Sequence, residues 1–101
     1  MVASQRRKKI AKMALNKLQE LMVITMEECG ELTQRCSKII RKFNTLDEIT
    51  EDQRIKLLEE VGDVQCLIDL MVECGLLTKA EIDARIDTKR DKLKTWSELV
   101  Q

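Results

Sequence analysis

The chain has 101 residues, of which 44% are hydrophobic and 2% aromatic, with three glycines and no proline. This length suits one domain and not two, and so few turn residues exclude a sandwich or barrel of short strands. Lysine and arginine balance aspartate and glutamate at zero net charge, but residues 1–20 are mostly basic and residues 43–75 mostly acidic. We therefore expect a single all-α domain over residues 1–101, in which residues 1–15 form a basic N-terminal helical extension.

The first long helix is predicted from about Asn16 to Phe43, where apolar residues recur at intervals of three and four. Its apolar stripe contains Leu18, Leu21, Met22, Thr25, Met26, Cys29, Leu32, Cys36, Ile39 and Ile40. The pattern stops over about residues 44–50, which predict a loop. Thr50, with two acidic residues after it, suits the start of the next helix, because acids favour the positive end of the helix dipole.

A second long helix is predicted to end at Gly75, since glycine commonly caps helix C-termini. Its apolar stripe contains Ile55, Leu58, Val61, Val64, Leu67, Ile68, Met71 and Val72. Thr78 and Glu81 then form the Thr-x-x-Glu pattern of a capping box, which predicts a third helix from Lys79 with an inner face of Ile82, Ile86, Leu93 and Trp96. The short loop between the first two helices predicts that they pack antiparallel.

The cysteines, Cys29, Cys36, Cys66 and Cys74, form no C-x-x-C pair, and the chain has no histidine, so a zinc site is not expected. Because Cys29 and Cys36 lie on the first apolar stripe, we expect them to be small buried thiols and expect no disulfide framework. No apolar run resembles a signal peptide or a membrane span. These features predict a soluble, cytoplasmic protein with no membrane partner.

The apolar pattern also predicts self-association. Val23 and Ile24 lie away from the main stripe of the first helix and need a covering surface. A chain with so few helices and so little aromatic bulk builds a thin core, and symmetric association is the common remedy. We expect a homo-oligomer, either a dimer or a tetramer.

Two acidic segments of the same pattern carry the candidate chemistry. They are Glu27-Glu28-Cys29-Gly30-Glu31-Leu32 on the first helix and Glu59-Glu60-Val61-Gly62-Asp63-Val64 on the second. In each segment two acids three residues apart share one helix edge, at the boundary of the buried face. If the helices are antiparallel neighbours, four carboxylates converge.

Four carboxylates in a partly buried pocket repel one another, so they either take up protons or bind a cation. Oxygen ligands without imidazole or thiolate favour Mg²⁺, with Mn²⁺ as a substitute, and such a site commonly also binds phosphate oxygens. A glycine inside a helix costs about 1 kcal/mol relative to alanine, so Gly30 and Gly62 suggest a close approach at the site. The alternative is that the acids are ordinary solvated residues, as each motif alone would suggest.

These residues resemble the MazG-like branch of the all-α NTP pyrophosphohydrolase superfamily, and most of all its short phage-encoded members. The resemblance extends over about residues 16–98 and rests on both acidic motifs, on Ser37-Lys38-Ile39-Ile40-Arg41 and on the ending Lys92-Leu93-Lys94-Thr95-Trp96-Ser97. It implies an oligomeric antiparallel helical bundle. It also implies a location in the cytoplasm, which for a phage-encoded protein is the cytoplasm of the host. It also implies metal-dependent hydrolysis of a (deoxy)nucleoside triphosphate to a nucleoside monophosphate and pyrophosphate.

By position, the resemblance implies that Glu28, Glu31, Glu60 and Asp63 are the metal ligands. Glu27 is a candidate to orient or deprotonate the attacking water, with Glu59 as an alternative. Substrate phosphates would be contacted by four basic residues, Lys38, Arg41, Lys89 and Lys92, each of which could equally be a solvated surface residue.

The resemblance does not fix the base of the substrate. Family members often carry an asparagine near the basic residues of the last helix, whereas this chain has Asp87 and Asp91. A second function class also stays open, a non-catalytic helical adaptor that binds nucleic acid or an acidic partner through the basic residues at the start of the chain. Release of pyrophosphate would distinguish the enzyme from the adaptor.

Overall fold

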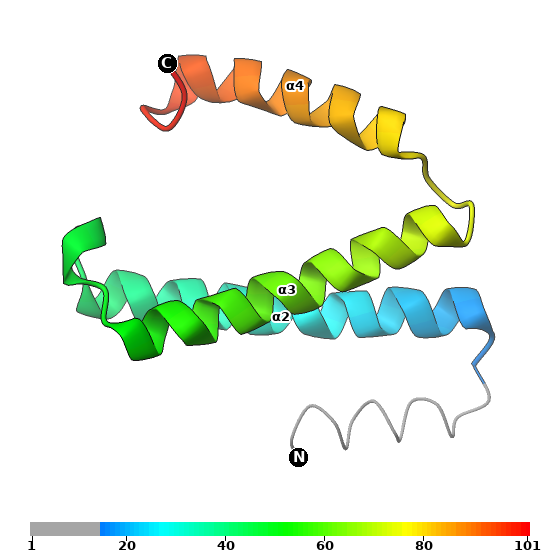
Figure 1. Cartoon of the computed structure of the whole chain (residues 1–101), viewed down its shortest axis with the longest axis horizontal. Helices are drawn as coiled ribbons and strands as arrows, with labels where there is room; N and C mark the ends of the chain where they lie inside the picture. Colours follow the sequence, from blue (N-terminus) through cyan, green and yellow to red (C-terminus); the bar gives the residue numbers. More distant parts are fainter. Residues whose placement is uncertain (1–14) are drawn as a thin grey trace. The chain divides into compact units, whose positions relative to one another are not determined.

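The computed structural model describes residues 15–101, and this part of the chain is helical (Figure 1). Its elements are α2 (Lys17–Lys42), the short 3₁₀ helix η1 (Leu46–Glu48), α3 (Glu51–Glu73) and α4 (Lys79–Trp96). Within residues 15–101 there is no strand, which confirms the all-α prediction. The predicted extension over residues 1–15 lies, except for its last residue, outside the described residues.

The chain divides into two compact units. The first ends at Asp69 and includes α2, η1 and most of α3. The second begins at Leu70 and includes the last turn of α3 and the whole of α4. Each unit is described by itself.

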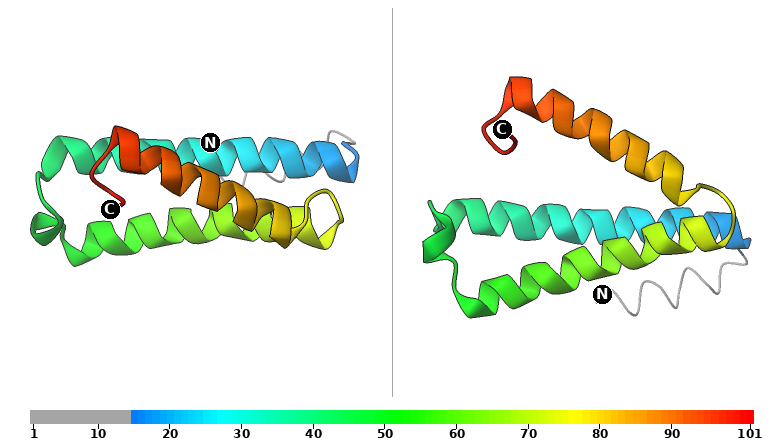
Figure 2. Two further views of the ribbon diagram at one scale, coloured as in Figure 1. Left: turned by 90° about the horizontal axis from the view of Figure 1, so that it is seen from above. Right: turned by 45° about the horizontal axis from the view of Figure 1, so that its top comes forward.

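The first unit is a helical hairpin whose ends are fixed by side-chain caps. At the start of α2, the amide of Gln19 donates to Oδ1 of Asn16 at 2.8 Å, and the amide of Asn16 donates to Oε1 of Gln19 at 3.1 Å. In the loop, the amide of Asn44 donates to the Glu48 carboxylate at 2.6 Å. The bounds of α2 and the start of α3 agree with the predicted positions to within a residue. In both figures α2 and α3 lie side by side and run antiparallel (Figures 1 and 2).

The C-terminus of α3 is closed by a glycine in a left-handed conformation. Gly75 has a φ of 82°. Its amide donates to the carbonyl of Val72, and the amide of Leu76 donates to the carbonyl of Met71, both at 3.0 Å. This pair of bonds is a Schellman motif, which satisfies carbonyls that the helix end leaves open. Gly75 is therefore confirmed as the predicted helix terminator.

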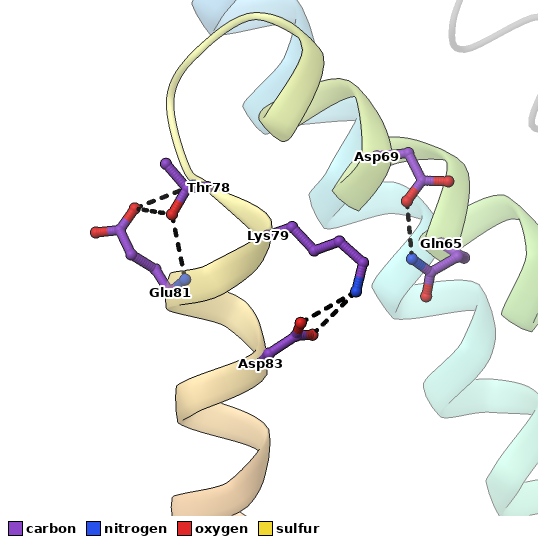
Figure 3. Close-up of polar contacts among 6 residues, drawn as sticks. All are labelled: Gln65, Asp69, Thr78, Lys79, Glu81 and Asp83. Atoms are coloured by element: carbon purple, nitrogen blue, oxygen red, sulfur yellow. Dashed lines mark hydrogen bonds and ion pairs between the residues drawn. The ribbon is translucent and has the colours of Figure 1, made fainter.

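The start of α4 has the predicted capping box (Figure 3). The amide of Glu81 donates to Oγ1 of Thr78 at 3.2 Å, and the amide of Thr78 donates to the Glu81 carboxylate at 3.0 Å. Lys79, the first residue of α4, forms an ion pair with Asp83 one turn later, with its Nζ 3.0 Å from Oδ2. Local sequence chemistry thus sets where this helix begins.

The α2 stripe is wider than one neighbouring helix can cover. One side of it is half-buried, through Leu21, Met22, Thr25, Leu32, Ile39 and Phe43. The other side is exposed: Met26 has an exposed fraction of 72% and Ile40 one of 77%. Cys29 and Cys36 lie on this exposed side, so the prediction of buried thiols was wrong. All four cysteines are free.

The predicted α3 stripe also divides. In the first half of α3 the half-buried residues are Gln53, Lys56, Leu57 and Glu60. The apolar residues Ile55, Leu58 and Val61, which we expected to be in the core, are exposed. The predicted apolar face and the face turned toward α2 are therefore different faces in this half of the helix. Polar side chains consequently occupy part of the space between α2 and α3.

The core of the described residues is very small. Leu67, with an exposed fraction of 8%, is the only hydrophobic residue in residues 15–101 that is buried. Val23 and Ile24, which we expected to lack cover, are half-buried. In the described part of the chain, no helix has the length and apolar character needed to cross a membrane.

Candidate functional site

Four carboxylates converge between α2 and α3. Glu28 and Glu31 come from α2, and Glu60 and Asp63 come from α3. One carboxylate oxygen from each residue lies within 4.8 Å of the corresponding oxygens of the other three. The structure thus brings together all four predicted metal ligands, because the two acidic motifs meet at the same level of the antiparallel hairpin.

The four carboxylates differ in their exposure to water. Glu28 has an exposed fraction of 2% and is the only charged residue of the described chain that is buried. Glu31 and Glu60 are half-buried, and Asp63 is exposed. The sequence placed Glu28 at the edge of the buried face, whereas it lies inside because its helix face is turned toward α3. The cluster is therefore closed on the Glu28 side and open to solvent at Asp63.

The pKa of Glu60 reflects the electrostatics of the cluster. Burial raises the pKa of its carboxyl, because a charge loses hydration there. The neighbouring Glu31 raises this pKa further, through its charge and through a hydrogen bond, and Asp63 adds repulsion. The guanidinium of Arg35 opposes these effects and lowers it. Ionisation of Glu60 is therefore disfavoured in the absence of a cation.

The donor set fits a hard divalent cation. Buried carboxylates that repel one another gain most from a bound positive charge, and Oε2 of Glu60 is buried without a hydrogen-bond partner among the described residues. Mg²⁺ and Mn²⁺ prefer oxygen ligands, and the cluster offers only oxygens. These four residues could therefore hold such a cation.

The two glycines of the acidic motifs meet no neighbour within the described hairpin. A Cβ atom added at Gly30 or at Gly62 would meet no atom within 4 Å. The expected close approach at the site stays a prediction. Glu27, the candidate for the water, is half-buried next to Glu28 and is not a member of the four-carboxylate cluster.

Basic residues line a groove beside the cluster, in the direction of the interhelical loop. The groove has a volume of about 420 Å³ and is lined by Arg35, Lys38, Arg41, Lys42, Gln53 and Lys56. Lys38 and Arg41, which we predicted as phosphate contacts, are both part of it. The structure thus groups these two residues in one place, close to the acidic cluster along both helices.

Sequence reasoning missed Arg35, Gln53 and Lys56. The signal was available in the antiparallel register of the acidic motifs. One turn from Glu31 toward the loop is Arg35, and one turn from Glu60 toward the loop is Lys56.

Lys89 and Lys92, the remaining predicted phosphate contacts, are exposed residues of α4 in the second unit. Lys89 lines a separate groove on that unit with Leu77, Ile82 and Ile86. Their contribution to the site of the first unit stays a prediction.

No known protein family, curated protein or solved structure matches this chain. The site described above therefore carries the functional argument.

Proposed function

We propose that this protein is a metal-dependent nucleoside triphosphate pyrophosphohydrolase of the MazG-like type, producing a nucleoside monophosphate and pyrophosphate. The observation that carries the proposal is the convergence of four carboxylates, one of them buried, between two antiparallel helices. Burial of several like charges is costly unless a cation compensates for it. A cation held by carboxylates on one side is available to phosphate oxygens on the other.

In this proposal Glu28, Glu31, Glu60 and Asp63 hold Mg²⁺, for which Mn²⁺ can substitute. When bound, the cation supplies positive charge that stabilises the phosphate oxygens and aligns the triphosphate. The exposed position of Asp63 leaves the cluster open to an incoming substrate. Glu27, next to Glu28 on the same helix, is proposed to accept a proton from the attacking water.

The basic residues provide the complementary part of the proposed site. Lys38 and Arg41 are exposed and lie in the groove beside the cluster, where they can contact the departing pyrophosphate. Arg41 is held in place by a bond of 3.3 Å from its Nε to the carbonyl of Ser37. Lys89 and Lys92 of α4 are proposed as further contacts of the same kind.

We also propose that the active form is a homo-oligomer, a dimer or a tetramer. The exposed side of α2 supports this proposal, since it forms an apolar groove of about 550 Å³ lined by Leu32, Thr33, Cys36, Ser37, Ile40 and Arg41. An exposed apolar face beside a minimal core favours association, because fully burying an aliphatic side chain contributes about 1.5–3 kcal/mol. A second copy presents the same apolar surface and is the proposed occupant.

The experiment is a panel of ribonucleoside and deoxyribonucleoside triphosphates, incubated with the protein and Mg²⁺, with products identified by phosphorus NMR. The proposal expects a monophosphate and pyrophosphate. A diphosphate and orthophosphate, or no hydrolysis of any nucleotide, would contradict it. Glu60→Gln is the inactive control, since the amide keeps the shape of the side chain but lacks the charge that holds the cation.

The second candidate is a non-catalytic adaptor that binds nucleic acid or an acidic partner. Its basic segment, which includes Arg6, Arg7, Lys8, Lys9 and Lys12, lies outside the described residues. A protein that hydrolyses no nucleotide but retards DNA or RNA in a gel would favour this candidate.

A further inference from the structure

We propose that Arg35, Gln53 and Lys56, together with Lys38, form a phosphate-chain subsite that binds the terminal phosphates of the substrate and makes the enzyme prefer triphosphates to diphosphates. The inference rests on the proposed function for the identity of the substrate. The capacity of the subsite to bind a short polyanion is a separate property, which depends on the groove alone.

The first argument is the composition of the groove. Its lining, as far as the described residues form it, contains five cationic side chains and one amide, and no carboxylate. Asp52, which is not part of the lining, pairs with Lys56 at 3.2 Å. Cations held this close together repel one another, and an anion with several negative charges removes that repulsion.

The second argument is the state of Arg35. This side chain is half-buried between the helices, and its Nη1 donates to Oε1 of Gln53 at 3.1 Å. Its Nε is also buried, and it has no hydrogen-bond partner among the described residues. Buried donors are normally satisfied, so the guanidinium of Arg35 has unused donor capacity, and guanidinium groups commonly bind phosphate through two parallel bonds. The bond to Gln53 links Arg35 to the α3 side of the groove.

The third argument is the position of the groove relative to the carboxylates. Arg35 lies one turn from Glu31 on α2, and Lys56 lies one turn from Glu60 on α3, both toward the loop. Arg35 is close enough to lower the pKa of Glu60. One helical turn is about 5.4 Å, a distance that the phosphates beyond a metal-bound phosphate can span. The subsite therefore lies where the far end of a triphosphate would extend.

The same arrangement disfavours nucleic acid as the ligand. An extended phosphate backbone that follows the groove would continue into the four carboxylates, which repel it. A short chain of phosphates ends before that point or is bridged to the carboxylates by the cation. The groove is thus suited to a short and densely charged anion.

The test measures binding of inorganic tripolyphosphate by calorimetry in EDTA, where no divalent cation contributes. We expect the wild-type protein to bind and the double variant Arg35→Gln, Lys56→Gln to bind at least about tenfold more weakly, since hydrogen bonds to charged groups carry that much affinity. The matched control is Lys79→Gln, Arg85→Gln, which removes one lysine and one arginine from the other unit and should bind like the wild type. Equal affinities for all three proteins would overturn the proposal.

Four further measurements keep the result interpretable. Circular dichroism must show the double variant folded, and Arg35→Lys alone should bind more weakly than the wild type but more tightly than the double variant, because lysine keeps the charge and lacks the paired donors of the guanidinium. In EDTA, Glu60→Gln should bind tripolyphosphate at least as tightly as the wild type, although it fails to hydrolyse nucleotides. A protein that binds a single-stranded DNA dodecamer but not tripolyphosphate would refute the subsite.

The nucleotide assay separates the two proposals. If the subsite is correct, the double variant loses more kcat/KM for a triphosphate than for the diphosphate of the same nucleoside. Hydrolysis with an unchanged ratio of the two kcat/KM values would refute the subsite and leave the proposed function intact. Binding of tripolyphosphate to the groove in a protein that hydrolyses nothing would refute the proposed function and support the anion site.

Discussion

Replacement of Glu60 by glutamine should stabilise the metal-free protein. Its carboxylate lies within 4.8 Å of three others. Two unit charges at that separation repel by about 3.5 kcal/mol at an effective dielectric constant of about 20 and by about 0.9 kcal/mol in water. Since Glu60 is half-buried, the expected gain in the free energy of unfolding lies between these limits, at about 1–3 kcal/mol.

The assay is a thermal unfolding scan in EDTA at pH 7 and fixed protein concentration. For a domain of this size each kcal/mol raises Tm by about 4–8 °C, so Glu60→Gln should raise it by at least about 4 °C. Asp63→Asn should give a smaller increase, because Asp63 is exposed and its charge is better screened by water. Glu98→Gln, on an exposed residue outside the cluster, should leave Tm unchanged.

The same scan with saturating Mn²⁺ completes the test. Binding to the folded chain should raise the Tm of the wild type by mass action and should leave the Tm of both cluster variants nearly unchanged. If Glu60→Gln lowered Tm in EDTA, or if it responded to Mn²⁺ as strongly as the wild type, the reasoning from clustered charges would be refuted.

Three other predictions follow from the same structure. The pKa of Glu60 is raised by burial and by Glu31, so ionisation of Glu60 opposes folding. In urea titrations without metal, the stability advantage of Glu60→Gln should therefore be absent in acid. The advantage should grow as pH rises from about 4.5 through that raised pKa. A constant advantage at every pH would contradict this. Gly75→Ala should lower the free energy of unfolding by about 1–2 kcal/mol, because alanine is strained at a φ of 82°, and an unchanged urea midpoint would count against the left-handed cap. Ile40→Glu should lower the mass measured by light scattering at micromolar concentration, because it places a charge on the exposed apolar side of α2. Gln34→Glu, at an exposed polar position of the same helix, should leave the mass unchanged. An unchanged mass for Ile40→Glu would exclude this face as the interface.

Local sequence signals predicted the helices well. Asn16, Gly75 and Thr78 act through contacts with residues a few positions away, so their roles can be read without knowing the rest of the fold. The four carboxylates were also predictable, since the two motifs repeat and a short loop forces their helices to be antiparallel neighbours. Their convergence depends on register alone, which the motifs themselves supply.

Burial was much less predictable. Apolar spacing shows that a helix has an apolar face, but it does not show which neighbour covers that face. In α3 the residues turned toward α2 include Gln53, Lys56 and Glu60, and the apolar Leu58 points elsewhere. The burial of Glu28 and the position of the cationic groove both follow from which face of α3 is turned toward α2.

The most direct test of the central claim is a titration of Mn²⁺ into the protein, with free Mn²⁺ followed by electron paramagnetic resonance. The account predicts that the wild type removes Mn²⁺ from solution, that Glu60→Gln and Asp63→Asn each largely abolish this binding, and that Glu98→Gln binds like the wild type. It also predicts that wild-type affinity falls as the pH is lowered through the raised pKa of Glu60, since protons compete with the metal for the same oxygens. Wild-type protein that leaves all the Mn²⁺ free, or cluster variants that bind it as tightly as the wild type, would contradict the account.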